Sequence, residues 1–135
     1  YKFELGKGVT LKEGTDVTLI ATGLMVGEAL KAQKILAEEN ISARVINIHT
    51  IKTIDKDIII KAAKETGALV SCEEHNVIGG LGSAVCDTLC ANYPTPVLKI
   101  GVNDVYGESG PAVQLVKKYG LDAESIYKKV KAFLA

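Results

Sequence analysis

Short apolar runs alternate with amphipathic stretches along most of the chain. The segment from Val17 to Ala21 is almost wholly apolar and ends at Thr22-Gly23, as expected of a buried strand. A helical pattern follows, because apolar residues recur there at the spacing of one helix face. These residues are Met25, Ala29, Ala32 and Leu36.

A small hairpin is predicted ahead of this buried strand. Residues 9–11 are Val-Thr-Leu, which favour a strand, and residues 12–16 are Lys-Glu-Gly-Thr-Asp, which favour a turn. Two strands joined by so short a turn usually pair with each other. We therefore expect residues 9–11 to lie against residues 17–21.

The same order of strand and helix continues to the end of the chain. Asn40 and Gly67 suit the left-handed position that closes a helix, and Asp55 and Asp122 suit the N-cap of a following helix. Pro111 suits the first position of a short helix. The expected elements are strands at 42–49, 68–71 and 97–100, and helices at 56–66, about 83–92, 112–119 and 123–134.

This alternation predicts an α/β domain with a mostly parallel sheet and helices on both faces. The sequence contains no internal repeat and no long linker, so a single domain over residues 1–135 is expected, with residues 1–8 as a linker remnant. In such folds ligands and partners meet the loops at the carboxyl ends of the strands. The corresponding loops are at 22–23, 49–50, 73–82 and 102–110.

Composition narrows the possible environment and partners. The chain has 135 residues, with 16 Lys and Arg against 16 Asp and Glu, so its net charge offers no general attraction to nucleic acid or to an anionic membrane. No apolar run is long enough to span a bilayer. Three cysteines without a framework spacing favour a reducing, cytoplasmic setting. The first residue is Tyr1 rather than Met, as expected of a piece of a longer polypeptide.

The segment CEEHNVIGGLGSAV, residues 72–85, holds the densest candidate chemistry. Its GLGSAV portion resembles a dinucleotide fingerprint, but Val85 stands where glycine or alanine is required and the glycines do not follow a strand directly. No G-K-[ST] is present, which excludes a P-loop. Nucleotide binding by either motif is therefore disfavoured.

A zinc site is the next interpretation of these residues. Cys72 and His75, together with Cys86 and Cys90, supply four possible ligands, but their spacing departs from that of structural zinc sites. Cys86 and Cys90 share a helical stripe with Leu89, so we expect them to behave as small buried hydrophobes.

Acid–base and anion-binding sites are two further alternatives. Glu73, Glu74 and His75, with His49 at a neighbouring strand end, are typical acid–base groups, but no nucleophile motif accompanies them. The two histidines are therefore expected to be hydrogen-bonded structural or interface residues. The helix that begins near Ser83 offers free backbone N–H groups, and its glycines allow close approach. An anion or nucleotide site there remains open.

Four segments resemble a known family: GKGVTLKEGTDVTLIATG, ARVINIHTIKTID, CEEHNVIGGLGSAV and DVYGESGP with VKKYGLDAESI. Their order and spacing over residues 3–134 are similar to the carboxyl-terminal domain of transketolase. Deoxyxylulose phosphate synthase and the β subunits of 2-oxo acid dehydrogenases are also similar. His75, the IHTIK segment at 48–52 and the YGESG loop at 106–110 favour transketolase, especially the kind encoded as two subunits. Thr53 stands where the family often has proline.

The resemblance implies a three-layer αβα fold, with a mostly parallel five-stranded sheet and one antiparallel edge strand. It also implies transfer of a two-carbon ketol unit between sugar phosphates, as in the pentose phosphate pathway, by a dimeric enzyme. The implied cofactor is thiamine diphosphate with magnesium or calcium, bound in this family by the first two domains. This chain has no G-D-G motif and nothing that matches the activating glutamate. We therefore expect no catalytic or cofactor residue here, and no activity from the chain alone.

The expected partners are then the N-terminal and middle transketolase domains or subunit, in a homodimeric holoenzyme, and neither nucleic acid nor a membrane. The strand-end loops would face these neighbouring domains. Glycine suits such a role because it lets two backbones approach closely. The candidate interface or anion-binding residues are His49, Glu74, His75, Gly79, Gly80, Gly82 and Ser83.

Overall fold

The computed structural model describes residues 7–49, 54–76, 80–102 and 120–135, without the side chains of residues 75, 76 and 102. Five strands form one sheet, flanked in the described part of the chain by four helices. The strands are β1 (Val9–Lys12), β2 (Val17–Ala21), β3 (Ala43–Asn47), β4 (Leu69–Asn76) and β5 (Val97–Val102). The helices are α1 (Met25–Glu38), α2 (Lys56–Thr66), α3 (Leu81–Asn92) and α5 (Ala123–Leu134).

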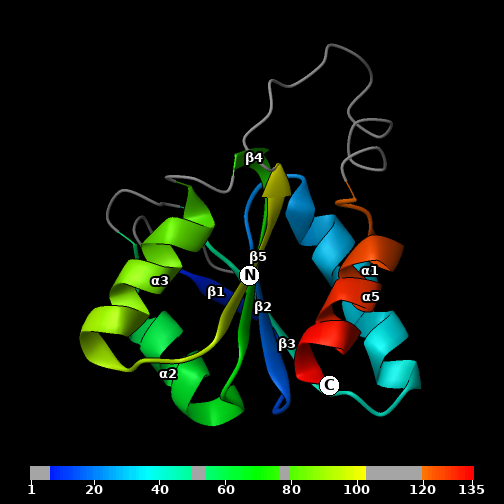
Figure 1. Cartoon of the computed structure of the whole chain (residues 1–135), viewed down its shortest axis with the longest axis horizontal. Helices are drawn as coiled ribbons and strands as arrows, with labels where there is room; N and C mark the ends of the chain where they lie inside the picture. Colours follow the sequence, from blue (N-terminus) through cyan, green and yellow to red (C-terminus); the bar gives the residue numbers. More distant parts are fainter. Residues whose placement is uncertain (1–6, 50–53, 77–79, 103–119) are drawn as a thin grey trace.

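The sheet lies between two helical layers (Figure 1). The strand order is β1-β3-β2-β4-β5, and every neighbouring pair is parallel except β1 with β3. Helices α1 and α5 cover one face, and α2 and α3 cover the other. The expected three-layer fold, with a mostly parallel sheet and one antiparallel edge strand, is confirmed.

The predicted hairpin between residues 9–11 and 17–21 is wrong. β1 pairs with β3, where Val9 lies opposite Asn47, and β2 instead lies between β3 and β4. All five residues of β2 are buried, as expected of a central strand whose two faces are both covered by helices. The connecting segment passes the start of β3, where Asp16 N–H donates to the Ser42 carbonyl at 2.8 Å.

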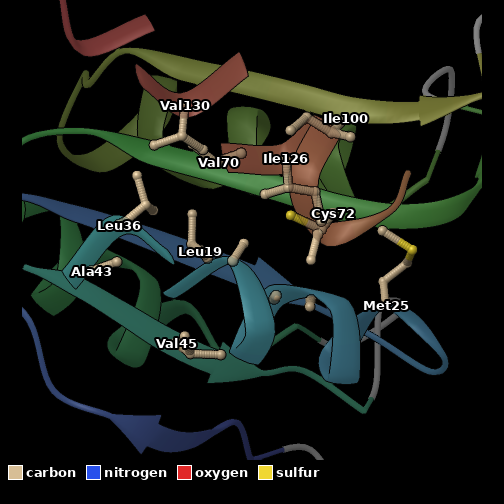
Figure 2. Packing of buried hydrophobic residues seen from close by; sticks show 14 of the residues in the cluster. Leu19, Met25, Leu36, Ala43, Val45, Val70, Cys72, Ile100, Ile126 and Val130 are labelled. Atoms are coloured by element: carbon tan, nitrogen blue, oxygen red, sulfur yellow. The ribbon is translucent and has the colours of Figure 1, made fainter. Parts of the chain in front are cut away.

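Alternate residues of the inner strands β2 and β4 belong to two separate cores. On the α1 and α5 side, Leu19 and Cys72 pack with helix residues such as Met25 and Ile126 (Figure 2). On the α2 and α3 side, Ile20 belongs to a second cluster together with residues of both helices. This period of two is what the pleat of a strand buried on both faces requires.

Three predicted helix ends are confirmed. Asp55 accepts a hydrogen bond from Ile58 N–H at 3.4 Å as the N-cap of α2, and Gly67 closes that helix with φ 76°. Asn40 follows α1 with φ 62°. Asp122 is the N-cap residue of α5, but its side chain makes no capping hydrogen bond to the helix backbone. The predicted helix at 112–119 lies outside the described residues.

The start of α5 is held instead by a residue distant in sequence. Glu28, in α1, accepts a hydrogen bond from Ala123 N–H at 3.0 Å. A carboxylate at a helix N-terminus satisfies a free amide and complements the helix dipole. This contact therefore ties the two helices of one layer together. None of the described helices has the length and apolar character needed to cross a membrane.

The close passage of Gly14 by β3 gives a test of the strand order. A Cβ at Gly14 would overlap the backbone of Ala43 and Arg44, so Gly14→Ala should lower the free energy of unfolding by about 1–3 kcal/mol, as overpacking does. Gly27→Ala is the matched control, because nothing lies within 4 Å of a Cβ there. It should stabilise α1 by up to about 1 kcal/mol. Urea unfolding of both variants measures this, and equal stability of the two would contradict the strand order.

Candidate functional site

The segment at residues 72–85 begins in the sheet rather than in a loop. β4 runs from Leu69 to Asn76, so the expectation that the strand ends at residue 71 is wrong. Parallel pairing with β5 extends it, with Cys72 opposite Ile100 and Asn76 opposite Val102. The two glutamates therefore occupy successive strand positions and project to opposite faces of the sheet.

Glu73 is the buried member of the pair, with a relative exposure of 1%. Its two carboxylate oxygens accept hydrogen bonds from Leu81 N–H at 3.0 Å and Gly82 N–H at 2.8 Å. The N-cap residue of α3, Gly80, has no side chain to cap the helix, and the first turn contains no acidic residue. Glu73 therefore supplies from β4 the acceptor that α3 lacks locally.

This contact bears directly on the anion-binding alternative. The helix predicted to begin near Ser83 begins at Leu81, and two of its first amides already donate to Glu73. An external phosphate at this helix terminus would have to displace a buried carboxylate that makes charge-assisted hydrogen bonds. The geometry therefore disfavours an anion site here.

Glu74 lies on the other face, towards the start of α1. It is half-buried, and a Cβ placed on Gly23 would lie 3.0 Å from its Oε1 atom. Gly23 has φ 58°, a left-handed conformation that favours glycine. The carboxylates of Glu73 and Glu74 thus adjoin the starts of α3 and α1 respectively.

The remaining predicted residues do not form one cluster. His49 is half-buried just beyond β3. The preceding residue, Ile48, donates its N–H to the Ala21 carbonyl at 3.0 Å, which keeps this part of the chain beside the end of β2. His75 lies in β4, and its side chain is not described. Gly79 lies outside the described residues, and Gly80 is half-buried at the N-cap of α3.

Gly82 and Ser83 face β5. A Cβ at Gly82 would lie 2.6 Å from Ser71 Oγ and 2.8 Å from Lys99 Cγ. The absence of a side chain at Gly82 is therefore required by packing inside this domain. Ser83 Oγ accepts a hydrogen bond from Lys99 Nζ at 3.4 Å.

The sequence suggested Glu73 only as an acid–base group, and it did not single out Leu24. The signal for the position of Glu73 is the alternation along β4, because Ser71 and Glu73 face α3 while Cys72 faces α1 and α5. Leu24 was overlooked because it lies in the turn before α1, yet it is 43% exposed at the carboxyl edge of the sheet. Single exposed leucines are ordinary, so the significance of Leu24 comes from its position beside Gly23.

The three cysteines do not form a zinc site. Cys72 is buried in the core beneath α1 and α5, where burial raises its pKa to about 12. Cys86 and Cys90 lie on α3, in the opposite layer. No group of three or more potential ligands occurs among the described residues. The expectation that both α3 cysteines are buried is also wrong, because Cys86 is half-buried and Cys90 is exposed.

The role of Glu73 can be tested with Glu73→Gln. Glutamine keeps the shape, but its amide group can accept only one of the two N–H bonds and presents a donor to the other. The free energy of unfolding should fall by about 1–3 kcal/mol, as for a buried unsatisfied group. Glu74→Gln, at a half-buried neighbour, should change it by less than about 0.5 kcal/mol. Equal losses in chemical denaturation would contradict this assignment.

Comparisons with known proteins agree with this architecture. Residues 6–126 match the model of the transketolase C-terminal domain. A 6-deoxy-6-sulfo-D-fructose transketolase subunit of Clostridium sp. (strain MSTE9) is 46% identical over 127 residues, which are 94% of this chain and 39% of that protein. A 1-deoxy-D-xylulose-5-phosphate synthase of Thermomicrobium roseum is 42% identical over 97% of this chain and 21% of that enzyme.

A solved structure described as a split-gene transketolase, in an inactive β4 tetramer, superimposes with a TM-score of 0.93 at 50% identity. The match covers 99% of this chain and 44% of that one. This chain thus spans less than half the length of each of these three relatives. It belongs to the transketolase C-terminal domain family.

Proposed function

We propose that this chain is the assembly domain of a thiamine-diphosphate-dependent transketolase, acting in the cytoplasm. The enzyme would transfer a two-carbon ketol unit between sugar phosphates. The observation that carries the proposal is the match to the transketolase C-terminal domain over residues 6–126. The chain would join the N-terminal and middle domains or subunit, within a homodimer.

The described residues do not fit a thiamine diphosphate site. A metal–diphosphate site needs several oxygen ligands for its cation, and the described part of the chain holds no group of three or more potential ligands. Its buried carboxylate, Glu73, is already used by two amides of α3. We therefore assign cofactor binding, and the magnesium or calcium that accompanies it, to the partner domains.

The carboxyl edge of the sheet is the surface that we assign to those domains. Glu73 fixes the first turn of α3 there, and Glu74 adjoins the turn at Gly23. Leu24 projects from that turn with 43% of its surface exposed. Docking of a neighbouring domain would bury the 43% of Leu24 that is exposed, which contributes roughly half of the about 1.5–3 kcal/mol gained by burying a whole leucine side chain. His49 and Gly80, both half-buried, would border the contact.

Catalytic dependence on the partner domains is the first test. The chain mixed with thiamine diphosphate, magnesium, a ketose phosphate donor and an aldose phosphate acceptor should give no ketol transfer. Addition of the N-terminal and middle domains of its parent enzyme should then produce transfer, measured by the appearance of the new ketose phosphate. Transfer by the chain alone would overturn the proposal.

The docking surface has a matched pair of variants. Leu24 and Tyr93 are the large apolar residues exposed in the described part of the chain, at 43% and 41%, and Tyr93 follows the far end of α3, away from the carboxyl edge. Leu24→Asp should weaken association with the partner domains about tenfold or more, the equivalent of about 1.4 kcal/mol. Tyr93→Asp should leave the association unchanged. Calorimetric titration measures both, and equal effects would remove Leu24 from the interface.

A second parent enzyme is supported by the comparisons. The 42% identity to the synthase of Thermomicrobium roseum is close to the 46% identity to the Clostridium transketolase subunit. The same assembly role would then serve 1-deoxy-D-xylulose-5-phosphate synthesis. Pairing the chain with the remaining domains of each enzyme type, and measuring which product forms, distinguishes the two parents.

A further inference from the structure

Two thiols on the outer part of α3 have no role in the proposed assembly. Cys86 and Cys90 are four residues apart in the helix, and both are free cysteines. Residues at this spacing are neighbours on one helix face. Cys86 is half-buried and Cys90 is exposed, whereas Cys72 is buried on the other side of the sheet. The pair is therefore the accessible thiol site of the chain.

A positive charge lies beside this pair. Lys99, in β5, donates a hydrogen bond from Nζ to Ser83 Oγ at 3.4 Å, which holds its ammonium against the flank of α3. Burial raises the pKa of the Cys86 thiol; the nearby Lys99 charge opposes that rise, and the Asp87 carboxylate adds to it. Cys90 also interacts electrostatically with Cys86. Two sulfurs and one ammonium thus share a small region of the surface.

The helical spacing does not favour a disulfide between these cysteines. Side chains four apart on a helix have Cβ atoms about 5–6 Å apart, whereas a disulfide needs about 3.5–4.5 Å. The helix remains regular beyond the pair, since Tyr93 N–H donates to the Leu89 carbonyl at 2.8 Å. A bridging ion suits the wider spacing better, because two metal–sulfur bonds of about 2.3 Å each add length between the sulfurs.

We propose that Cys86 and Cys90 form a two-thiolate binding site for a soft monovalent cation, with copper(I) as its ligand class and Lys99 as the counter-charge. Each thiol releases its proton to solvent, and each sulfur forms one bond to the ion without any change in oxidation state. Two thiolates and one monovalent cation leave a net charge of −1. The ammonium of Lys99 offsets part of the negative charge that the thiolates and the nearby Asp87 carboxylate create.

The number of ligands favours a monovalent ion over zinc. Structural zinc is held by four ligands, and no third potential ligand completes a group with this pair among the described residues. Thiolates are soft ligands that select copper(I). The site is thus suited to an ion that two sulfurs can satisfy.

The test is an anaerobic titration of the full chain with copper(I), buffered by a coloured copper(I) chelator. One copper per chain should bind, and the absorbance of the copper(I)–chelator complex should fall accordingly. Cys86→Ser and Cys90→Ser should each weaken binding by about 100-fold or more, because each removes the effective concentration that the second sulfur provides. Lys99→Gln should weaken it by about tenfold, as loss of a supporting neighbour does.

The double variant Cys86→Ser with Cys90→Ser is the control for the remaining thiol, since it keeps the buried Cys72. It should bind no copper, and circular dichroism should show the same melting curve as the unaltered chain. Copper binding by the double variant would overturn the site. So would wild-type affinity in Cys90→Ser, or a stoichiometry of one copper per two chains, which would indicate bridging between molecules.

Discussion

The buried carboxylate of Glu73 ties the central sheet to helix α3, and the arrangement of the carboxyl edge depends on it. Both of its oxygens are used by amides of Leu81 and Gly82, so the helix starts at a fixed place relative to β4. A helix terminus buried without partners would be costly. Because Gly80 offers no side chain as a cap, the acceptor has to come from elsewhere in the fold.

The opposite layer contains a similar contact. Glu28 of α1 accepts the N–H bond of Ala123 at the start of α5, so two of the described helices are capped by glutamates from other elements. Such bonds form only when the elements that carry the donor and the acceptor have packed together. Both contacts position helix starts at the carboxyl edge of the sheet, where Leu24 also lies. Defined helix positions suit a domain whose proposed function is to dock.

Local chemistry explains which features the sequence predicted well. The apolar stripe of α1 and the Asp55 cap of α2 depend on residues a few positions apart, and these were correct. The hairpin of residues 9–21 failed because a turn indicates only that the chain changes direction. In the folded sheet the fully buried β2 lies between β3 and β4, and β1 pairs with β3 at the edge. The capping role of Glu73 could not be predicted locally, because the amides that donate to it lie eight and nine residues away.

The sequence by itself determined the α/β class, most element positions and, through its family-specific segments, the membership of the transketolase C-terminal family. The tertiary structure alone decided which of two adjacent glutamates is buried, and that the α3 cysteines lie apart from Cys72. The physical reason is the sequence separation over which each effect acts. Periodicity and caps act within a few residues, whereas burial and charge compensation depend on which surfaces the sheet brings together.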